Sequence, residues 1–166
     1  MLPMKTLTLL AVLAAAAYGC ASSTAPRAQN ACELLSKDDL LAVQGEAFSQ
    51  THLTTAGNRS QCFYELPTFV NSVSVDMTRE GRELWERMFE AGEREGKDAE
   101  EEEKKAPPKR ITGIGDEAFW VGNRAVGSLY VRRRGVVVRV SVGGKGTLEE
   151  KIERSKRLAA QALRHI

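Results

Sequence analysis

Val136-Val-Val-Arg-Val-Ser-Val142 is the stretch from which the fold can be predicted, because it is the most β-prone segment of the chain. An Arg134-Gly135 turn precedes it, and residues 125–133 run back towards that turn, so the two segments predict a hairpin. Residues 111–120 form a glycine-rich bend that leads into another strand. The second half of the chain therefore predicts three successive strands.

Three earlier strands are expected at 47–54, 61–66 and 69–77. The first alternates poorly and indicates an edge strand, whereas the other two alternate apolar and polar residues well. Their apolar positions share one face, which predicts an antiparallel sheet covered on that side. These positions are Cys62, Tyr64, Leu66, Phe69, Val73, Val75 and Met77.

Three helices complete the predicted fold. Ser36 and Asp39 form a capping-box pattern with Gly45 as the stop signal, and Thr147 and Glu150 repeat the pattern before the C-terminal helix. A middle helix follows the third strand, and its apolar stripe is wide enough to cover a sheet: Leu84, Trp85, Met88 and Phe89. The expected class is α+β, with a six-stranded, mainly antiparallel sheet and packing helices in the order α-βββ-α-βββ-α.

The first residues have the composition of an export signal. In residues 1–19, Lys5 precedes an apolar run that is shorter than the ~20 residues needed to span a bilayer, and small residues stand near its end. Cys20 follows directly, as in a bacterial lipobox, which predicts that its thiol receives a lipid. The alternative is ordinary signal cleavage, after which Cys20 either stays in the mature chain without a lipid or is removed with the signal.

Anchoring through Cys20 predicts a cell-envelope location. This would be the outer membrane, facing the periplasm, if the host has two membranes, and otherwise the outer face of the plasma membrane. Residues 20–30 are small and polar and predict a flexible tether. Residues 31–166 are expected to form a single α+β domain that carries a charged insert at 93–110.

The remaining two cysteines, Cys32 and Cys62, are expected to form a disulfide. Two thiols in an oxidising compartment usually pair, and the chain contains no Cys-x-x-Cys that would indicate a redox site. The expected role of the pair is therefore structural.

The charge balance argues against a nucleic-acid partner. The chain has 24 basic and 22 acidic residues, and removing Lys5 with the signal leaves 23 against 22. One basic cluster stands out at a hairpin end: Arg132, Arg133 and Arg134. It is the candidate contact for an anionic envelope polymer or for lipid head groups. The alternative is a solvated turn whose charges protect a hydrophobic strand from aggregation.

Two glycine-rich motifs resemble nucleotide-binding loops but lack the required context. Gly113, Gly115 and Ala118 match part of a dinucleotide fingerprint, yet a charged loop precedes them and a β-rich segment follows. Residues 143–147 lie between a strand and a helix, as a phosphate-binding loop would. However, their order is Lys-Gly-Thr instead of Gly-Lys-Thr, so the lysine and the hydroxyl are not where the phosphates and magnesium need them. Both are expected to be turns, with Asp116 capping the first of them.

No catalytic residue, metal site or cofactor is expected. His52 and His165 lie far apart without a second ligand at useful spacing, and no nucleophile motif is present. An enzyme would instead need a site assembled from residues distant in sequence. A pocket that joins two or more of the following would favour that alternative: Asp76, His52, Asp116, Glu117 and Tyr130.

A family resemblance combines several of these features. They are the lipobox, the polar tether, Cys32-Glu-Leu-Leu-Ser36 before a short helix, Gln-Cys62-Phe-Tyr64, and residues 113–120 (Gly-Ile-Gly-Asp-Glu-Ala-Phe-Trp). The set resembles small bacterial lipoproteins of unknown function, best represented in actinobacteria, some of which are thought to have a PsbP-like α/β sandwich. The resemblance covers about 31–166 and implies no catalytic residue. Departures from it are the insert at 93–110 and Ala17 in the lipobox.

These observations lead to one expected function and two alternatives. We expect an exported, lipid-anchored, non-catalytic envelope protein that binds a ligand or a protein partner. The first alternative is a small envelope hydrolase with a dispersed site. The second is a purely structural or accessory subunit.

Overall fold

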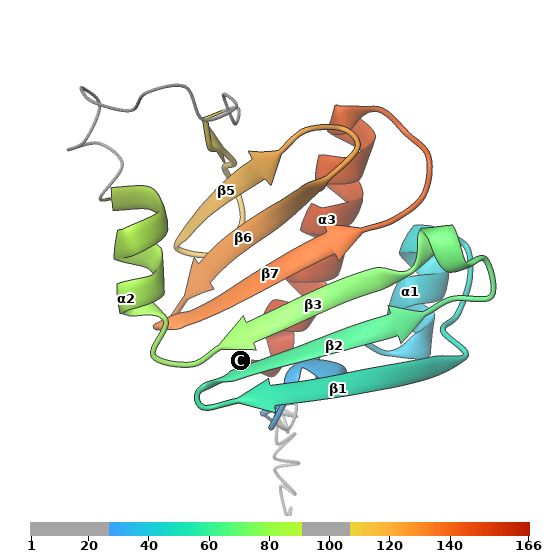
Figure 1. Cartoon of the computed structure of the whole chain (residues 1–166), viewed down its shortest axis with the longest axis horizontal. Helices are drawn as coiled ribbons and strands as arrows, with labels where there is room; N and C mark the ends of the chain where they lie inside the picture. The colour runs from blue at the N-terminus through green and yellow to red at the C-terminus, as the bar shows by residue number, and fades with distance from the viewer. Residues whose placement is uncertain (1–26, 91–106) are drawn as a thin grey trace, which may run out of the picture.

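One antiparallel sheet of seven strands organises the described part of the chain, residues 27–90 and 107–166, in a computed structural model (Figure 1). Across the sheet the strands follow the order β1-β2-β3-β7-β6-β5-β4. Their bounds are β1 Gln50–Ala56, β2 Arg59–Glu65, β3 Val73–Thr78, β4 Lys109–Arg110, β5 Glu117–Gly122, β6 Gly127–Arg133 and β7 Val136–Val142. The predicted hairpin of β6 and β7 is confirmed, and β7 lies at the centre of the sheet.

The first face of the sheet carries the hydrophobic core. Strand pairing aligns a buried row across five strands, in the order Cys62, Val75, Val140, Leu129 and Trp120. Each of these side chains is at most 2 % exposed. The period-2 alternation of the sequence therefore predicts correctly which side chains in β2 and β3 point inward.

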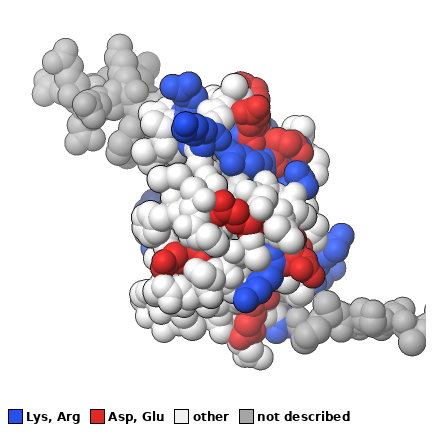
Figure 2. All heavy atoms as spheres, turned by 90° about the vertical axis from the view of Figure 1, so that its right-hand side faces the viewer, with Lys and Arg blue, Asp and Glu red and all other residues white. Residues whose placement is uncertain are grey.

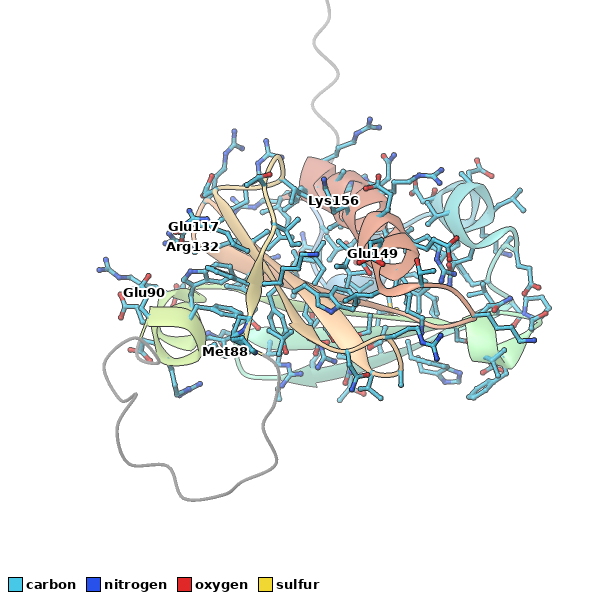
Figure 3. The ribbon with its side chains drawn as sticks, turned by 90° about the horizontal axis from the view of Figure 1, so that it is seen from above. Met88, Glu90, Glu117, Arg132, Glu149 and Lys156 are labelled. Atoms are coloured by element: carbon cyan, nitrogen blue, oxygen red, sulfur yellow. A yellow bond between two sulfur atoms is a disulfide. The ribbon has the colours of Figure 1, made fainter. Side chains whose placement is uncertain are left out.

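Two helices cover this first face. Helix α1 (Lys37–Gln44) and helix α3 (Leu148–Ala162) contact each other, and α3 also packs on β6 and β7. Both predicted capping boxes are confirmed, and Gly45 ends α1 with a left-handed φ of 79°. Figure 3, seen from above, shows α1 and α3 together on one side of the sheet. On the side of the molecule that carries α1, acidic and basic side chains are interspersed (Figure 2).

The middle helix lies on the second face of the sheet, opposite α1 and α3. It consists of α2 (Arg82–Trp85) and a π-helical turn, η3 (Glu86–Glu90). Phe89 of η3 stacks on Phe119 of β5, with ring centroids 4.7 Å apart, and also meets Tyr130 of β6 edge to face at 5.6 Å. The sheet is thus covered by helices on both faces, and on the second face the described helical segment packs on the half of the sheet that holds β5 to β7.

Two details differ from the sequence prediction. The sheet has seven strands rather than six, because Lys109–Arg110, inside the predicted insert, pairs with Trp120 and Phe119 as β4. The expected strand at 69–77 begins only at Val73, since residues 69–71 form a 3₁₀ turn, η2, that leaves Phe69 66 % exposed. The rest of the predicted insert, 93–106, lies outside the described residues.

The N-terminal segment is more ordered than a tether over its last residues. Ala28 is buried and donates its backbone N–H to the carbonyl of His165 at 2.8 Å, and Asn30 caps the short 3₁₀ helix η1 (Ala31–Glu33). The predicted Cys32–Cys62 disulfide is present and joins η1 to β2 with the Cα atoms 5.0 Å apart. Signal and lipobox positions 1–20 lie outside the described residues. None of the described helices is long and apolar enough to cross a membrane.

Candidate functional site

A pocket of about 190 Å³ lies between the second face of the sheet and the helical segment α2–η3. Leu84 and Met88 form its helical wall, and the strands β2, β3, β6 and β7 provide the rest. Figure 3 shows Met88 beside the sheet at the end that the helical segment covers. The strand residues of the lining are Arg59, Asp76, Thr78, Tyr130, Val137 and Arg139.

The polar side of the pocket is a buried carboxylate held between two guanidinium groups. Asp76 is 3 % exposed. Its Oδ1 accepts hydrogen bonds from Arg59 Nε at 3.0 Å and Nη2 at 2.5 Å. Its Oδ2 accepts from Arg139 Nε at 2.7 Å and lies 2.6 Å from Arg139 Nη2. An unpaired carboxylate at this depth would be strongly destabilising, so the two arginines compensate its desolvation.

Strand pairing explains why these three residues meet. Asp76 of β3 stands directly opposite Arg139 of β7 and opposite Gln61 of β2. Arg59 lies two residues from Gln61 on the same strand and therefore shares its face. All three side chains project to the second face because their neighbours in sequence occupy the core.

The three charged groups leave the pocket with one excess positive charge. Arg59 donates its Nε–H and one Nη2–H to Asp76, and Arg139 donates its Nε–H and places Nη2 close to the same carboxylate, so each guanidinium keeps at least three N–H donors. Within the described residues, the side-chain hydrogen bonds of Arg59 and Arg139 go to Asp76 alone. The side chains are 51 % and 27 % exposed, so the spare donors can reach solvent or a ligand at the mouth of the pocket.

The wall opposite the charges is apolar and well supported. Leu84, Met88 and Val137 contribute aliphatic and thioether surface, and Tyr130 contributes a ring. The ring of Phe89 packs against Tyr130 from the helical side. Met88 and Phe89 both belong to the π-helical turn. Such turns are rare in proteins overall, and those that occur are often found at functional sites.

A second polar cluster holds the helical segment on the sheet. Glu117 Oε2 accepts from Trp85 Nε1 at 3.0 Å and from Arg132 Nη2 at 2.7 Å. The guanidinium of Arg132 also lies 5.6 Å from the centroid of the Trp85 ring. Figure 3 shows Glu117 and Arg132 side by side at one end of the sheet. Since Trp85 is 1 % exposed, this cluster fixes the outer wall of the pocket.

The three arginines proposed as a basic cluster have separate partners. Arg132 binds Glu117, whereas Arg133 Nη1 donates to the carbonyl of Leu163, at 3.2 Å. Arg134 occupies the hairpin turn with φ +49°. The alternation of β6 sends Arg132 and Arg133 to opposite faces, so they do not form one surface with Arg134. That these arginines contact an anionic polymer therefore stays a prediction, and their separate locations give it no support.

Two of the five residues considered for a dispersed active site do meet. Asp76 and Tyr130 line the same pocket, which satisfies the criterion stated for an enzyme. However, both oxygens of Asp76 already accept hydrogen bonds from arginines, so neither is free to take a proton from a substrate or a water molecule.

The other three residues lie elsewhere. His52 Nε2 is 3.0 Å from Glu65 Oε2 at the β1 edge, and Glu117 holds Trp85. Asp116 accepts from the backbone N–H of Arg134 at 2.9 Å rather than capping its own loop.

Sequence reasoning missed Arg59 and Arg139 as site residues. The available signal was positional: Arg139 interrupts the valines of β7 at a position that must face away from the core, as Asp76 does in β3. Nothing in the sequence indicated that β3 and β7 are neighbours.

The two glycine-rich motifs are turns, as predicted. Gly113 and Gly115 have left-handed φ values of 79° and 61° and lead into β5, not into a helix. The loop at 143–147 is occupied by its own side chains, because Arg154 Nη2 donates to the carbonyl of Lys145 at 2.8 Å. Within the described residues, no three His, Cys, Asp or Glu side chains come together as a metal site.

The pocket therefore combines a cationic rim, a neutralised carboxylate and an apolar wall, an arrangement suited to holding a small molecule. Comparison of the chain with protein-family models, with curated proteins and with solved structures finds no match.

Proposed function

We propose that this chain is an exported, lipid-anchored cell-envelope protein whose domain binds a ligand without catalysing a reaction. The single observation that supports binding is the pocket under the α2–η3 segment, which has both apolar and charged lining. Concave sites with a mostly apolar wall and a few placed polar groups are the usual form of ligand sites.

The same pocket argues against the hydrolase alternative. A hydrolytic site needs a base or nucleophile whose lone pairs are available to the substrate or to a water molecule. Asp76 is the buried carboxylate of the pocket, and each of its oxygens is already held by a guanidinium. Turnover would require one arginine to leave Asp76, which would cost the charge-assisted hydrogen bonds to one of its two buried oxygens.

The anchoring part of the proposal rests on residues 1–20. The apolar run and the position of Cys20 support lipidation, and residues 21–26 provide a short spacer before the fold begins at Ala28. In a host with two membranes the location would be the outer membrane, facing the periplasm. In a host with one membrane it would be the outer face of the plasma membrane. The resemblance to small bacterial lipoproteins supports this location and leads us to propose a PsbP-like sandwich for the α+β domain.

Metabolic labelling with a fatty acid tests the anchoring. In a bacterium that processes lipoproteins, the wild-type chain should incorporate label and sediment with membranes, and Cys20→Ser should do neither. Ser22→Ala, a change of similar size two residues away, is the matched control and should behave as wild type. Equal labelling of wild type and Cys20→Ser, or a wild-type protein free of membranes, would show that the chain is not anchored through Cys20.

A further inference from the structure

We infer that the ligand of the α2–η3 pocket is a small amphipathic anion, with a carboxylate or phosphate head on Arg59 and Arg139 and an apolar part against Met88, Leu84 and Val137. This inference names the ligand class of the binding function proposed above and rests on it.

The charge of the site selects an anion. Two guanidiniums face one carboxylate, so the pocket keeps a net positive charge after all the ion pairs are formed. Guanidinium groups bind carboxylates and phosphates through paired N–H donors, and a partly desolvated site strengthens such bonds. A cation would meet two arginines and no available carboxylate oxygen, which makes a cationic ligand unfavourable.

The size and lining of the site select a short apolar group. About 190 Å³ is smaller than the ~300–1,000 Å³ of pockets that enclose drug-sized ligands. The helical wall offers Leu84 and Met88, and the floor offers Val137 beside the Tyr130 ring. Methionine side chains adapt their shape to the molecule that they contact, so the wall favours a flexible hydrocarbon chain over a rigid polar ligand.

A purely structural ion-pair cluster does not account for the arrangement. A single arginine would be enough to neutralise Asp76. Arg139 by itself already brings two nitrogens to one carboxylate oxygen, Oδ2. The second arginine adds a charge that no other described residue balances within the pocket. Asp76 also holds both guanidiniums in one orientation before a ligand arrives, which reduces the entropy lost on binding.

The experiment titrates the full chain carrying Cys20→Ser, which keeps lipid out of the sample, with four probes. They are hexanoate, hexyl phosphate, neutral hexanol and cationic hexylamine. Binding is followed by NMR through the side-chain Nε–H signals of Arg59 and Arg139 and the amide of Val137. We expect saturable shifts with hexanoate or hexyl phosphate, and binding by hexanol or hexylamine that is at least tenfold weaker. The tighter of the two anions identifies the head group as carboxylate or phosphate.

Two variants assign the effect to the arginines. Arg139→Gln and Arg59→Gln should each weaken anion binding about 10- to 100-fold, because each removes charge-assisted hydrogen bonds. Arg59 is half exposed, so its variant should fold even if Arg139→Gln does not. Arg124→Gln removes the same charge from an exposed loop and is the matched control, with unchanged affinity expected.

Three results would overturn the inference. They are binding of hexanol as tight as that of the tighter anion, equal losses in the Arg59→Gln and Arg124→Gln variants, and no saturable binding of either anion. Equal binding of hexanol would leave a binding module for neutral ligands, so the ligand class can fail while the proposed function stands. Conversely, a failed labelling experiment would remove the anchoring and leave the pocket result intact.

Discussion

Replacing Cys32 and Cys62 together by alanine should destabilise the domain without changing its fold. The disulfide joins residues 30 apart in sequence and closes a loop of about that length. The chain-entropy relation for such a loop gives about 3.6 kcal/mol of stabilisation at 25 °C through the unfolded state. Removing the buried sulfur of Cys62 adds a small packing loss, so we expect a total of about 3–5 kcal/mol.

The native fold should survive because other bonds also hold the segment. The backbone N–H of Ala31 donates to Ser60 Oγ at 2.9 Å, and Tyr64 Oη donates to the carbonyl of Ala31 at 2.7 Å. The bridge is attached to η1 and not to α1, whose Leu40 packs in the core independently. Loss of the bridge should therefore loosen residues 31–34 before α1.

Urea unfolding of the Cys20→Ser background with and without the double substitution measures the effect. With a slope of about 2 kcal/mol per M, the midpoint should fall by about 2 M. Hydrogen exchange should accelerate at the Leu34 amide, which donates to the Ala31 carbonyl, more than at Leu40. A loss below about 1 kcal/mol would refute the reasoning, as would reaction of both thiols in the untreated native protein.

Three further changes test the core and the site. Tyr64→Phe should cost about 1–2 kcal/mol by removing the shorter of the two hydrogen bonds that the buried Ala31 carbonyl accepts, leaving only the one from the Leu34 N–H. Burial raises the pKa of Tyr64 above its ordinary 10.0, so the wild type should lose stability as the pH rises past about 10. Urea midpoints measured between pH 8 and 11 should therefore decline less in Tyr64→Phe than in the wild type. Gly127→Ala should cost about 1–3 kcal/mol, because its Cβ would overlap the ring of the buried Trp120; an unchanged melting temperature would contradict this close approach. Asp76→Asn should cost about 1–3 kcal/mol, because it leaves Arg59 and Arg139 together without their anion; this figure is reduced because both arginines are partly exposed. An unchanged urea midpoint would show that the ion pairs contribute little to stability.

The features that the sequence alone determined are those with a short range along the chain. Ser36 with Asp39 and Thr147 with Glu150 predict helix starts because a capping box is closed within four residues. Cys62 and Tyr64 identify the inward face of β2 because side chains alternate strictly along a strand. The α+β class and the central hairpin follow from these local patterns.

The tertiary structure alone decided which strands are neighbours, and the pocket depends on that choice. Asp76 and Arg139 are 63 residues apart and meet because β3 pairs with β7, while alternation shows only that each points away from the core. The same applies to β4, which exists because Lys109–Arg110 finds the free edge of β5. The α2–η3 segment lies on the second face because Phe89 finds aromatic partners in β5 and β6. Pairing between strands is set by long-range packing and hydrogen bonding, which leave no periodic trace in a single sequence.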